Sequence, residues 1–274
     1  MEAMYDKNYP LITHSHDSRF VTLRFLQTQQ GRSRTGLYLI EGIRHLARAV
    51  EDHARIQSTF LDPSVLRNPF GQKLARRLID RGVPGVRLSP RLYRDLTLAG
   101  EPQGIGAILR QQWVPLAHVR AEQDSLWLAL ESIESQGNLG TIIRTAEATG
   151  VTGIFILGSE CDPYDPAAVR ASMGSLFSQR LTKCTPRELE TWAKSNGVTI
   201  VASSPAGVLD YKATRYRFPA ALLIGSEKRG LSDQLMKAAD LSVRIPMRGG
   251  CDSINAAVAA GVLLFEMSSQ GSAV

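Results

Sequence analysis

The C-terminal half of the chain alternates short apolar runs with longer amphipathic stretches. The runs contain few polar residues, as is typical of parallel strands that helices cover on both faces. They lie at residues 126–130, 153–157, 198–202, 221–224 and 243–245. The pattern therefore predicts an α/β fold with a parallel sheet over residues 124–274.

Helix-start signals fall between these runs. Thr185-Pro-Arg-Glu188 has the form of a capping box, and Gly197 is expected to end the helix that it begins. Asp165-Pro166 offers an N-cap followed by a proline at the first helical position. Asn138 is expected to cap a helix that ends at Gly150, at the point where the first strand feeds into the first helix.

The N-terminal part follows a weaker version of the same pattern. Residues 38–50 start extended and then place apolar side chains at helical spacing, and residues 72–81 are again amphipathic. Short apolar runs lie at residues 57–61, 86–88 and 105–109. We predict a smaller α/β domain over residues 36–111.

Composition places the chain among ordinary globular proteins. Of its 274 residues, 43% are hydrophobic and 21% are charged. The longest apolar run, at residues 256–265, is shorter than the roughly 20 residues that cross a bilayer, so we expect no membrane role. The N-terminus carries Asp, His and Lys where a signal peptide has an apolar segment, so a cytoplasmic location is expected.

Positive charge is concentrated in the N-terminal part. Residues 1–120 contain 18 Lys and Arg against 10 Asp and Glu, and 16 of these cations are arginines. The planar guanidinium suits phosphate, although a solvated basic face would have the same composition. The polar residues 1–35 end in Gly31-Arg-Ser-Arg34, and we predict a mobile or RNA-contacting arm with a short helix around residues 19–29. Residues 112–123 contain Pro115 and little periodicity, and are predicted to be a linker.

Neither cysteine nor histidine indicates a metal site. Cys161, Cys184 and Cys251 are odd in number and far apart, which favours reduced packing residues over a disulfide framework or a zinc site. All five histidines precede residue 120, so chemistry in the C-terminal half must use other groups. We expect no metal.

Three motifs in the C-terminal half carry candidate chemistry. Residues 137–144 hold Asn138 and Arg144 at a strand-to-helix junction, where free amides favour an anion. Residues 222–231 place Glu227 in a glycine loop after an apolar strand, and residues 245–266 combine a proline stop, a glycine loop and a helix rich in small residues that Ser253 is expected to cap. Each motif alone would suit an ordinary capped helix or turn.

Together, and in this order, the motifs resemble the SpoU/TrmH family of RNA 2′-O-methyltransferases in the SPOUT superfamily. The shared patterns are Asn-x-Gly-x-x-x-Arg, Gly-x-Glu-x-x-Gly, and Ile-Pro-Met followed by Ser-x-Asn. Leu39-Ile-Glu-Gly-Ile-Arg44 and Gln103-Gly-Ile-Gly-Ala107 also resemble the substrate-binding domain of the ribosomal-RNA branch. The third motif departs from the usual Ser-Leu-Asn-Val-Ser-Val at Ile254, Ala256 and Ala257, which removes a hydroxyl.

The resemblance implies a deep C-terminal trefoil knot that binds S-adenosylmethionine, and a homodimer whose active site draws on both chains. It implies cofactor contacts from the Ser203-Ser204 loop and from main-chain groups around four further residues, namely Gly225, Ile245, Met247 and Ile254. The residues implied in catalysis are Asn138, Arg144, Glu227, Ser253 and Asn255. Large-subunit (23S) ribosomal RNA is the expected substrate.

The role of Arg144 has two interpretations. In the family the matching arginine is proposed as the base that takes the proton of the 2′-hydroxyl. A guanidinium stays protonated in proteins. We therefore prefer that Arg144 binds the adjacent phosphate and stabilises the developing alkoxide, while Asn138, Glu227, Ser253 and Asn255 orient it and the ribose.

Other functions stay open at this point. Transfer RNA is the second candidate substrate, and a catalytically silent RNA-binding adaptor would share the fold. A nucleotide-dependent oxidoreductase would also alternate strands and helices, but the chain lacks the Gly-x-Gly-x-x-Gly turn. The motifs name neither the modified nucleotide nor its purpose, whether ribosome maturation or antibiotic resistance.

Overall fold

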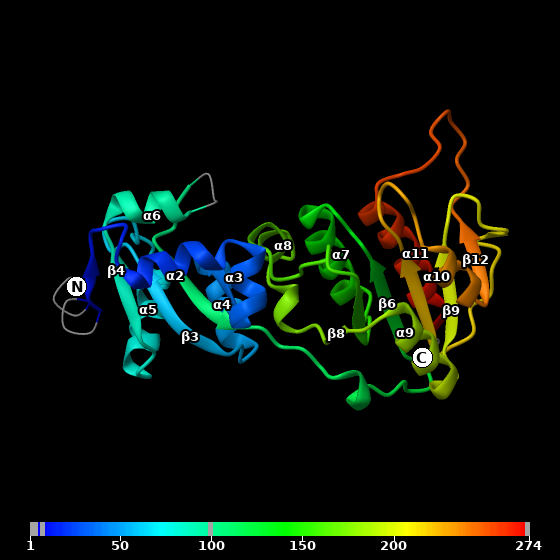
Figure 1. Cartoon of the computed structure of the whole chain (residues 1–274), viewed down its shortest axis with the longest axis horizontal. Coiled ribbons are helices and arrows are strands. Elements are labelled where there is room, and N and C mark those ends of the chain that lie inside the picture. The colour runs from blue at the N-terminus through cyan, green and yellow to red at the C-terminus, as the bar shows by residue number, and fades with distance from the viewer. Residues whose placement is uncertain (1–4, 6–8, 98–100, 272–274) are drawn as a thin grey trace. The chain divides into compact units, whose positions relative to one another are not determined.

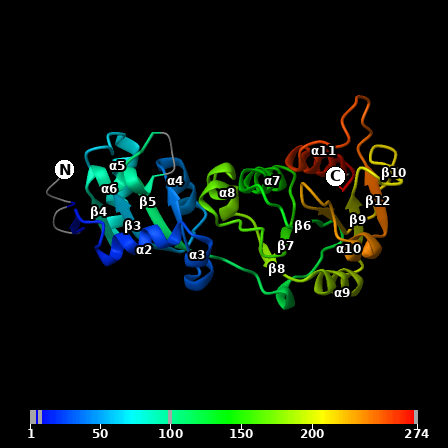
Figure 2. The same ribbon diagram turned by 45° about the horizontal axis from the view of Figure 1, so that its top comes forward.

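The chain forms two compact units, shown in Figures 1 and 2. The structure is a computed structural model that describes residues 5, 9–97 and 101–271. Unit 1 comprises the residues up to Gln111 together with Tyr164–Phe177, and unit 2 comprises Gln112–Pro163 and Ser178–Val274. Unit 1 therefore takes a short segment from the middle of the stretch that the sequence pattern assigns to the C-terminal domain.

Unit 1 is built on a five-stranded mixed sheet. Its strands are β1 (Leu11–Ile12), β2 (Leu37–Glu41), β3 (Ile56–Leu61), β4 (Gly85–Leu88) and β5 (Ile105–Arg110). They lie in the order β1-β4-β3-β5-β2, and β5 runs antiparallel to both of its neighbours. The structure confirms the strands predicted within residues 57–61, 86–88 and 105–109, whereas the two-residue β1 is too short to show a period.

Helices of unit 1 cover this sheet with amphipathic faces. They are α2 (Ser18–Leu26), α3 (Gln29–Thr35), α4 (Ile43–Glu51), α5 (Pro69–Asp80), α6 (Pro90–Leu96) and α8 (Pro166–Ala171). The short helix predicted around residues 19–29 is confirmed as α2, and α3 follows it. Phe20, Leu23 and Leu26 are buried in one apolar core with residues of the sheet. Their spacing of three residues gives α2 a buried face despite its polar surroundings.

Unit 2 contains a seven-stranded sheet. Its strands are β6 (Leu126–Glu131), β7 (Gly153–Leu157), β8 (Leu181–Lys183), β9 (Thr199–Ser203), β10 (Leu209–Asp210), β11 (Ala220–Ile224) and β12 (Leu241–Arg244). The order is β10-β12-β9-β11-β6-β7-β8, and every pairing is parallel, as predicted. β8 and β10 are short, which is why the apolar pattern did not reveal them. The trefoil knot stays a prediction.

The longer helices of unit 2 begin at recognisable caps. They are α7 (Gln136–Ala148), α9 (Pro186–Asn196) and α11 (Ala256–Gly271), with the shorter α10 (Asp233–Ala238). The capping box at Thr185 and the left-handed Gly197 after α9 are confirmed, and in unit 1 the Asp165 cap of α8 is confirmed as well. The rings of Trp127, Phe155 and Trp192 pack together between the sheet and α9.

Candidate active site

Glu227 lies on a tight turn at the carboxyl end of β11. Gly225 follows the strand, and a Cβ at this position would lie 2.2 Å from the carbonyl carbon of Gly230, so only glycine fits without a shift. The amides of Ser226 and Gly230 donate to each other's carbonyl oxygens at 3.1 and 2.9 Å. The turn is therefore closed on itself, and it presents Glu227 at the sheet edge where α/β proteins bind ligands.

The Glu227 carboxylate connects this turn to the start of α7. It accepts hydrogen bonds from the amides of Glu134 and Ser135 at 3.0 and 3.3 Å and from the side-chain nitrogen of Asn138 at 2.9 Å. Partial burial acts to raise the pKa of Glu227, but these hydrogen bonds outweigh it and leave the pKa below its ordinary value. The group is therefore a carboxylate at neutral pH, held by fixed donors.

Asn138 does not cap its helix, contrary to the sequence prediction. The cap of α7 is Ser135, whose hydroxyl accepts from the Asn138 amide, and the helix ends at Ala148. Because the cap lies three residues earlier, the Asn138 side chain is available for tertiary contacts. Its amide nitrogen donates to Glu227, and its oxygen accepts from the side chain of Asn255 at 3.1 Å.

Asn255, and not Ser253, caps α11. Its side-chain oxygen accepts from the amides of Ala257 and Val258 at 2.8 and 3.3 Å. The same side chain donates to Asn138, so one residue both begins the helix and joins the third motif to the first. The structure thus connects three of the predicted catalytic residues in one chain of hydrogen bonds: Glu227, Asn138 and Asn255.

A cavity of about 700 Å³ opens beside this network. It lies at the carboxyl ends of β9, β11 and β12, which are neighbours in the sheet. Its volume falls in the range of roughly 300 to 1,000 Å³ that is usual for small-molecule sites. All the predicted cofactor-binding residues line it, together with Glu227 and Asn255: Ser203, Ser204, Gly225, Ile245, Met247 and Ile254.

The two remaining predicted catalytic residues are placed differently. Ser253 lines the cavity, whereas Arg144 is exposed on α7 and does not line it. Arg144 follows Asn138 by six residues, which in an α-helix is about 9 Å along the axis and about 240° around it. The side of α7 that carries Asn138 toward Glu227 therefore does not carry Arg144.

The departures from the family pattern in the third motif have separate consequences. Ile254 and Ala256 line the cavity. Ala257, which stands where the family has a hydroxyl, is 7% exposed and does not line it. The loss of that hydroxyl therefore leaves the surface of the cavity unchanged.

Sequence reasoning missed residues that shape the site. Lys228 and Arg229 line the cavity, and the Lys228 ammonium forms an ion pair with Glu134 at 2.6 Å. Both residues belong to the second motif and directly follow Glu227, so their place in the sequence could have indicated that they line the cavity. Cys161 was expected only to pack. Its sulfur also accepts a hydrogen bond from the Ile133 amide at 3.0 Å, and the amides of the next two residues, Glu134 and Ser135, donate to Glu227. Burial raises the pKa of this thiol to about 12, which keeps it protonated.

Among residues 5, 9–97 and 101–271, no cluster of three or more His, Cys, Asp or Glu side chains is placed to hold a metal ion. Within the same residues, no helix has the length and apolar character needed to span a bilayer.

Comparison with known proteins agrees with this geometry. The SpoU rRNA Methylase family model matches residues 125–265, and the MRM3-like substrate binding domain model matches residues 19–107. The 23S rRNA (uridine(2479)-2′-O)-methyltransferase of Streptomyces viridochromogenes is 30% identical over 92% of this chain and 90% of its own length. The 23S rRNA (guanosine(2553)-2′-O)-methyltransferase of Bacillus subtilis is 26% identical over 88% of this chain and 92% of its own.

A solved structure extends the likeness to three dimensions. The AdoMet-bound rRNA methyltransferase from Sinorhizobium meliloti is 30% identical, with a TM-score of 0.86 over 94% of this chain and 97% of its own. The likeness covers both units, and the family match spans all three motifs. The chain belongs to the SpoU rRNA methylase family.

Proposed function

We propose that this protein transfers the methyl group of S-adenosylmethionine to a ribose 2′-hydroxyl of structured RNA, with 23S ribosomal RNA as the substrate. The observation that carries the proposal is the joint placement of the motifs. Glu227, Asn138 and Asn255 form one hydrogen-bonded chain beside a single cavity, and that cavity is lined by every residue expected to bind the cofactor.

The cavity fits S-adenosylmethionine in size and in chemistry. Ile245, Met247 and Ile254 give it an apolar wall suited to an adenine ring, and Ser203 and Ser204 offer hydroxyls for the polar parts. Gly225 also lines the cavity, and without a side chain it leaves its main chain open to the cofactor. When bound, the cofactor supplies an electrophilic sulfonium methyl group.

The protein's own residues must position the ribose and accommodate the charge that develops on its oxygen. Glu227 is held as a carboxylate and fixes Asn138, which in turn holds Asn255 at the start of α11. We assign to this network and to Ser253 the orientation of the RNA. We assign to Arg144 the binding of the neighbouring phosphate and the stabilisation of the alkoxide, because a guanidinium keeps its charge.

This assignment requires a homodimer. The Arg144 side chain does not line its own cavity and makes no hydrogen bond or ion pair with other described residues, so we propose that it serves the cavity of the partner subunit. Val258 and Phe265, seven residues apart on one side of α11, are 54% and 59% exposed, and α11 packs on α7. An interface over these two helices would cover both apolar side chains and bring Arg144 to the other chain.

The substrate assignment rests on the relatives and on unit 1. The names of the Streptomyces and Bacillus relatives both specify 2′-O-methylation of 23S rRNA, but at different nucleotides. The substrate-binding match over residues 19–107 and the excess of arginine in the same region favour RNA as the ligand of unit 1. Transfer RNA is the second candidate. A cytoplasmic location follows from either substrate.

The decisive experiment measures methyl transfer directly. Purified protein is incubated with cofactor labelled in the methyl group and with deproteinised 23S ribosomal RNA or bulk transfer RNA. Label is expected in the ribosomal RNA, at one 2′-O-methylated nucleotide that resists alkaline cleavage. Label in transfer RNA alone would move the substrate to the second candidate, and cofactor binding without any transfer would indicate the silent adaptor.

A further inference from the structure

A second, smaller cavity lies entirely within unit 1. Its volume is about 260 Å³, and it opens where β2 ends, α4 begins and α8 packs beside them. Apolar side chains form most of its wall, among them Leu39, Phe60, Leu96 and Val169. Polar side chains converge on it from several elements: Gln27, Glu41, Arg44, His45, Gln103 and Arg170. The methyl-transfer chemistry proposed above uses none of these residues.

The polar wall is held in place by the turn from β2 into α4. Gly42 makes this turn with a φ of +100°, which only glycine adopts without strain. A Cβ here would meet the side-chain oxygen of Gln103 at 3.1 Å. That oxygen accepts from the Ile43 amide at 2.7 Å, so the side-chain nitrogen of Gln103 remains a donor beside the cavity. The left-handed turn at Gly42 therefore explains why a glycine stands within the segment Leu39-Ile-Glu-Gly-Ile-Arg44.

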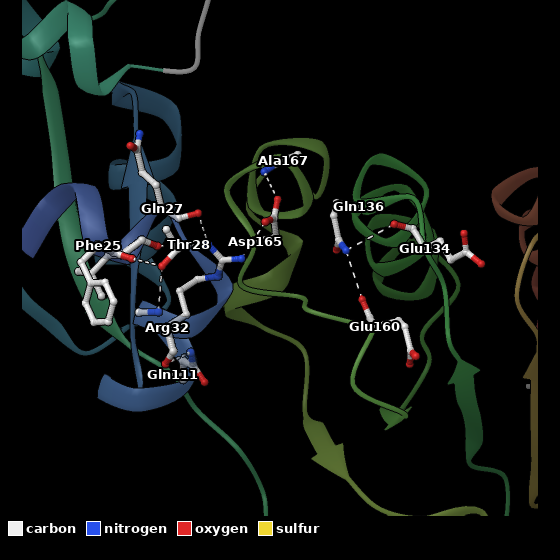
Figure 3. A network of polar contacts seen from close by, with 12 residues as sticks. Phe25, Gln27, Thr28, Arg32, Gln111, Glu134, Gln136, Glu160, Asp165 and Ala167 are labelled. Atoms are coloured by element: carbon white, nitrogen blue, oxygen red, sulfur yellow. Dashed lines mark hydrogen bonds and ion pairs between the residues drawn. The ribbon is translucent and has the colours of Figure 1, made fainter.

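The opposite wall is α8, and a buried arginine fixes it to the rest of unit 1. Arg32 is 2% exposed and donates to the carbonyl oxygens of Leu26 and Gln27 and, at 2.8 Å, to the Asp165 carboxylate (Figure 3). Asp165 also accepts from the Ala167 amide at 2.9 Å and so caps α8. The same ion pair thus anchors the helix that brings Val169 and Arg170 to the cavity.

The wall offers the hydrogen-bonding groups that a planar heterocycle requires. The Nε2 atom of His45 is buried and has no hydrogen-bond partner among the described residues. Burial lowers the pKa of His45, against backbone groups of Arg170 and Glu41 that favour its charged form, so a neutral ring faces the cavity. Glu41 adds a carboxylate acceptor, and Arg44 and Arg170 are exposed cations at its edge.

We propose that this cavity receives one unpaired base of the RNA substrate. The proposal rests on the proposed function, in that it takes RNA to be the ligand of unit 1. The volume lies just below the usual range for drug-sized ligands, so it admits a single base and excludes a dinucleotide. Proteins recognise RNA sequence mainly through unstacked bases packed on side chains and hydrogen-bonded at their edges. The apolar wall would cover the faces of the base, the polar groups its edge, and the two arginines the flanking phosphates.

The test uses the full-length protein and the four ribonucleoside 5′-monophosphates as probes. Saturating S-adenosylhomocysteine is added so that the cavity of unit 2 is occupied and cannot bind AMP. Titration calorimetry is expected to show one site per chain for at least one nucleotide. Val169→Phe, which fills the cavity, should weaken this binding at least 10-fold, whereas Val169→Ala at the same position should change it less than threefold.

Two further pairs of measurements keep the test independent of folding. If Val169→Phe strongly lowers the thermal midpoint of unfolding, nucleotide binding is measured on His45→Phe and Arg44→Ala instead. The control is Arg77→Ala on α5, which removes an arginine charge away from the cavity. Both cavity variants should weaken nucleotide binding about fivefold, and the control should not change it. Absence of binding for all four nucleotides, or wild-type affinity in the cavity variants, would overturn the proposal.

Competition with RNA identifies the source of the base. Deproteinised 23S ribosomal RNA should displace the bound nucleotide, and failure to displace it would indicate a site for free nucleotides and reject an RNA base. Methyl transfer is measured separately on the wild-type protein. Nucleotide binding that RNA displaces, without methyl transfer, would refute the proposed function and leave this proposal standing, and methyl transfer without nucleotide binding would do the reverse.

Discussion

The cavities of the two units are built in different ways. In unit 2 the cavity of about 700 Å³ lies over the carboxyl ends of three adjacent parallel strands, so loops and their main-chain groups form much of its wall. In unit 1 the cavity of about 260 Å³ is walled largely by side chains of β2, α4 and α8, next to a mixed sheet. A parallel sheet gathers loop ends at one edge and so forms a site for a large ligand. A packed wall of side chains suits a smaller, planar one.

If the two cavities serve different ligands, a substitution in one unit should change one binding constant and leave the other unchanged. Four variants test whether the two cavities work independently, and they are given in order of decreasing expected effect.

Arg144→Ala should have the largest effect, on the rate of methyl transfer alone. Removal of one group that stabilises developing negative charge costs about 10²–10³-fold in rate. Because Arg144 is assigned to the RNA phosphate and the ribose oxygen and makes no proposed contact with the cofactor, cofactor affinity should stay within twofold of wild type. Single-turnover methylation and calorimetric cofactor binding measure the two quantities. Wild-type turnover with intact cofactor binding would show that Arg144 acts neither as base nor as electrostatic stabiliser.

Arg32→Met should destabilise unit 1 and spare the cofactor site. Breaking a fully buried ion pair costs about 3–5 kcal/mol. Here Asp165 is 24% exposed and remains partly hydrated, so a loss of about 2–3 kcal/mol in unfolding free energy is expected. Denaturant unfolding gives this value, and calorimetry should show weaker nucleotide binding with unchanged cofactor binding. Arg34→Met on the exposed part of α3 is the control. Equal stability of the two variants would contradict the anchoring role of Arg32.

Gly225→Ala should disturb the cofactor cavity through steric overlap. The added Cβ would lie 2.2 Å from the carbonyl carbon of Gly230, and strain of this kind costs about 1–3 kcal/mol. The turn that carries Glu227 must shift, so cofactor affinity should fall. Gly249→Ala is the matched control, because a Cβ there meets nothing within 4 Å. The explanation would fail if both variants bound the cofactor as the wild type does.

Asn255→Asp should have the smallest effect on stability and separates two roles of one side chain. A carboxylate still accepts from the amides of Ala257 and Val258, so the cap of α11 is kept. The donor to Asn138 is lost, and the methylation rate should fall about 10-fold, less than the roughly 100-fold that a misplaced positioning group can cost. Asn255→Ala should in addition lose about 1 kcal/mol of stability. The melting temperature and the turnover rate are measured on both variants. Equal melting temperatures for Asn255→Asp and Asn255→Ala would refute the capping role, and wild-type turnover in both would refute the positioning role.

Local patterns predicted much of the secondary structure. Nearly continuous apolar runs predicted β6, β7, β9 and β11, and the capping box at Thr185 predicted the start of α9. These signals could be read from the sequence because they depend on residues only a few positions apart. The family resemblance of the motifs likewise implied residues that line the cavity of unit 2, where parallel strands present their carboxyl ends at one edge.

The sequence by itself therefore determined the family and the parallel sheet, and its motifs name residues that line the cavity of unit 2. Only the tertiary structure decided the caps of α7 and α11, because Ser135 and Asn255 were as suitable locally as Asn138 and Ser253. It also decided that α2 joins a core of unit 1 and that residues 164–177 belong to unit 1, where Asp165 pairs with Arg32. These features depend on contacts between residues far apart in the chain, such as Arg32 and Asp165, whose numbers differ by 133, and no local periodicity reports such contacts.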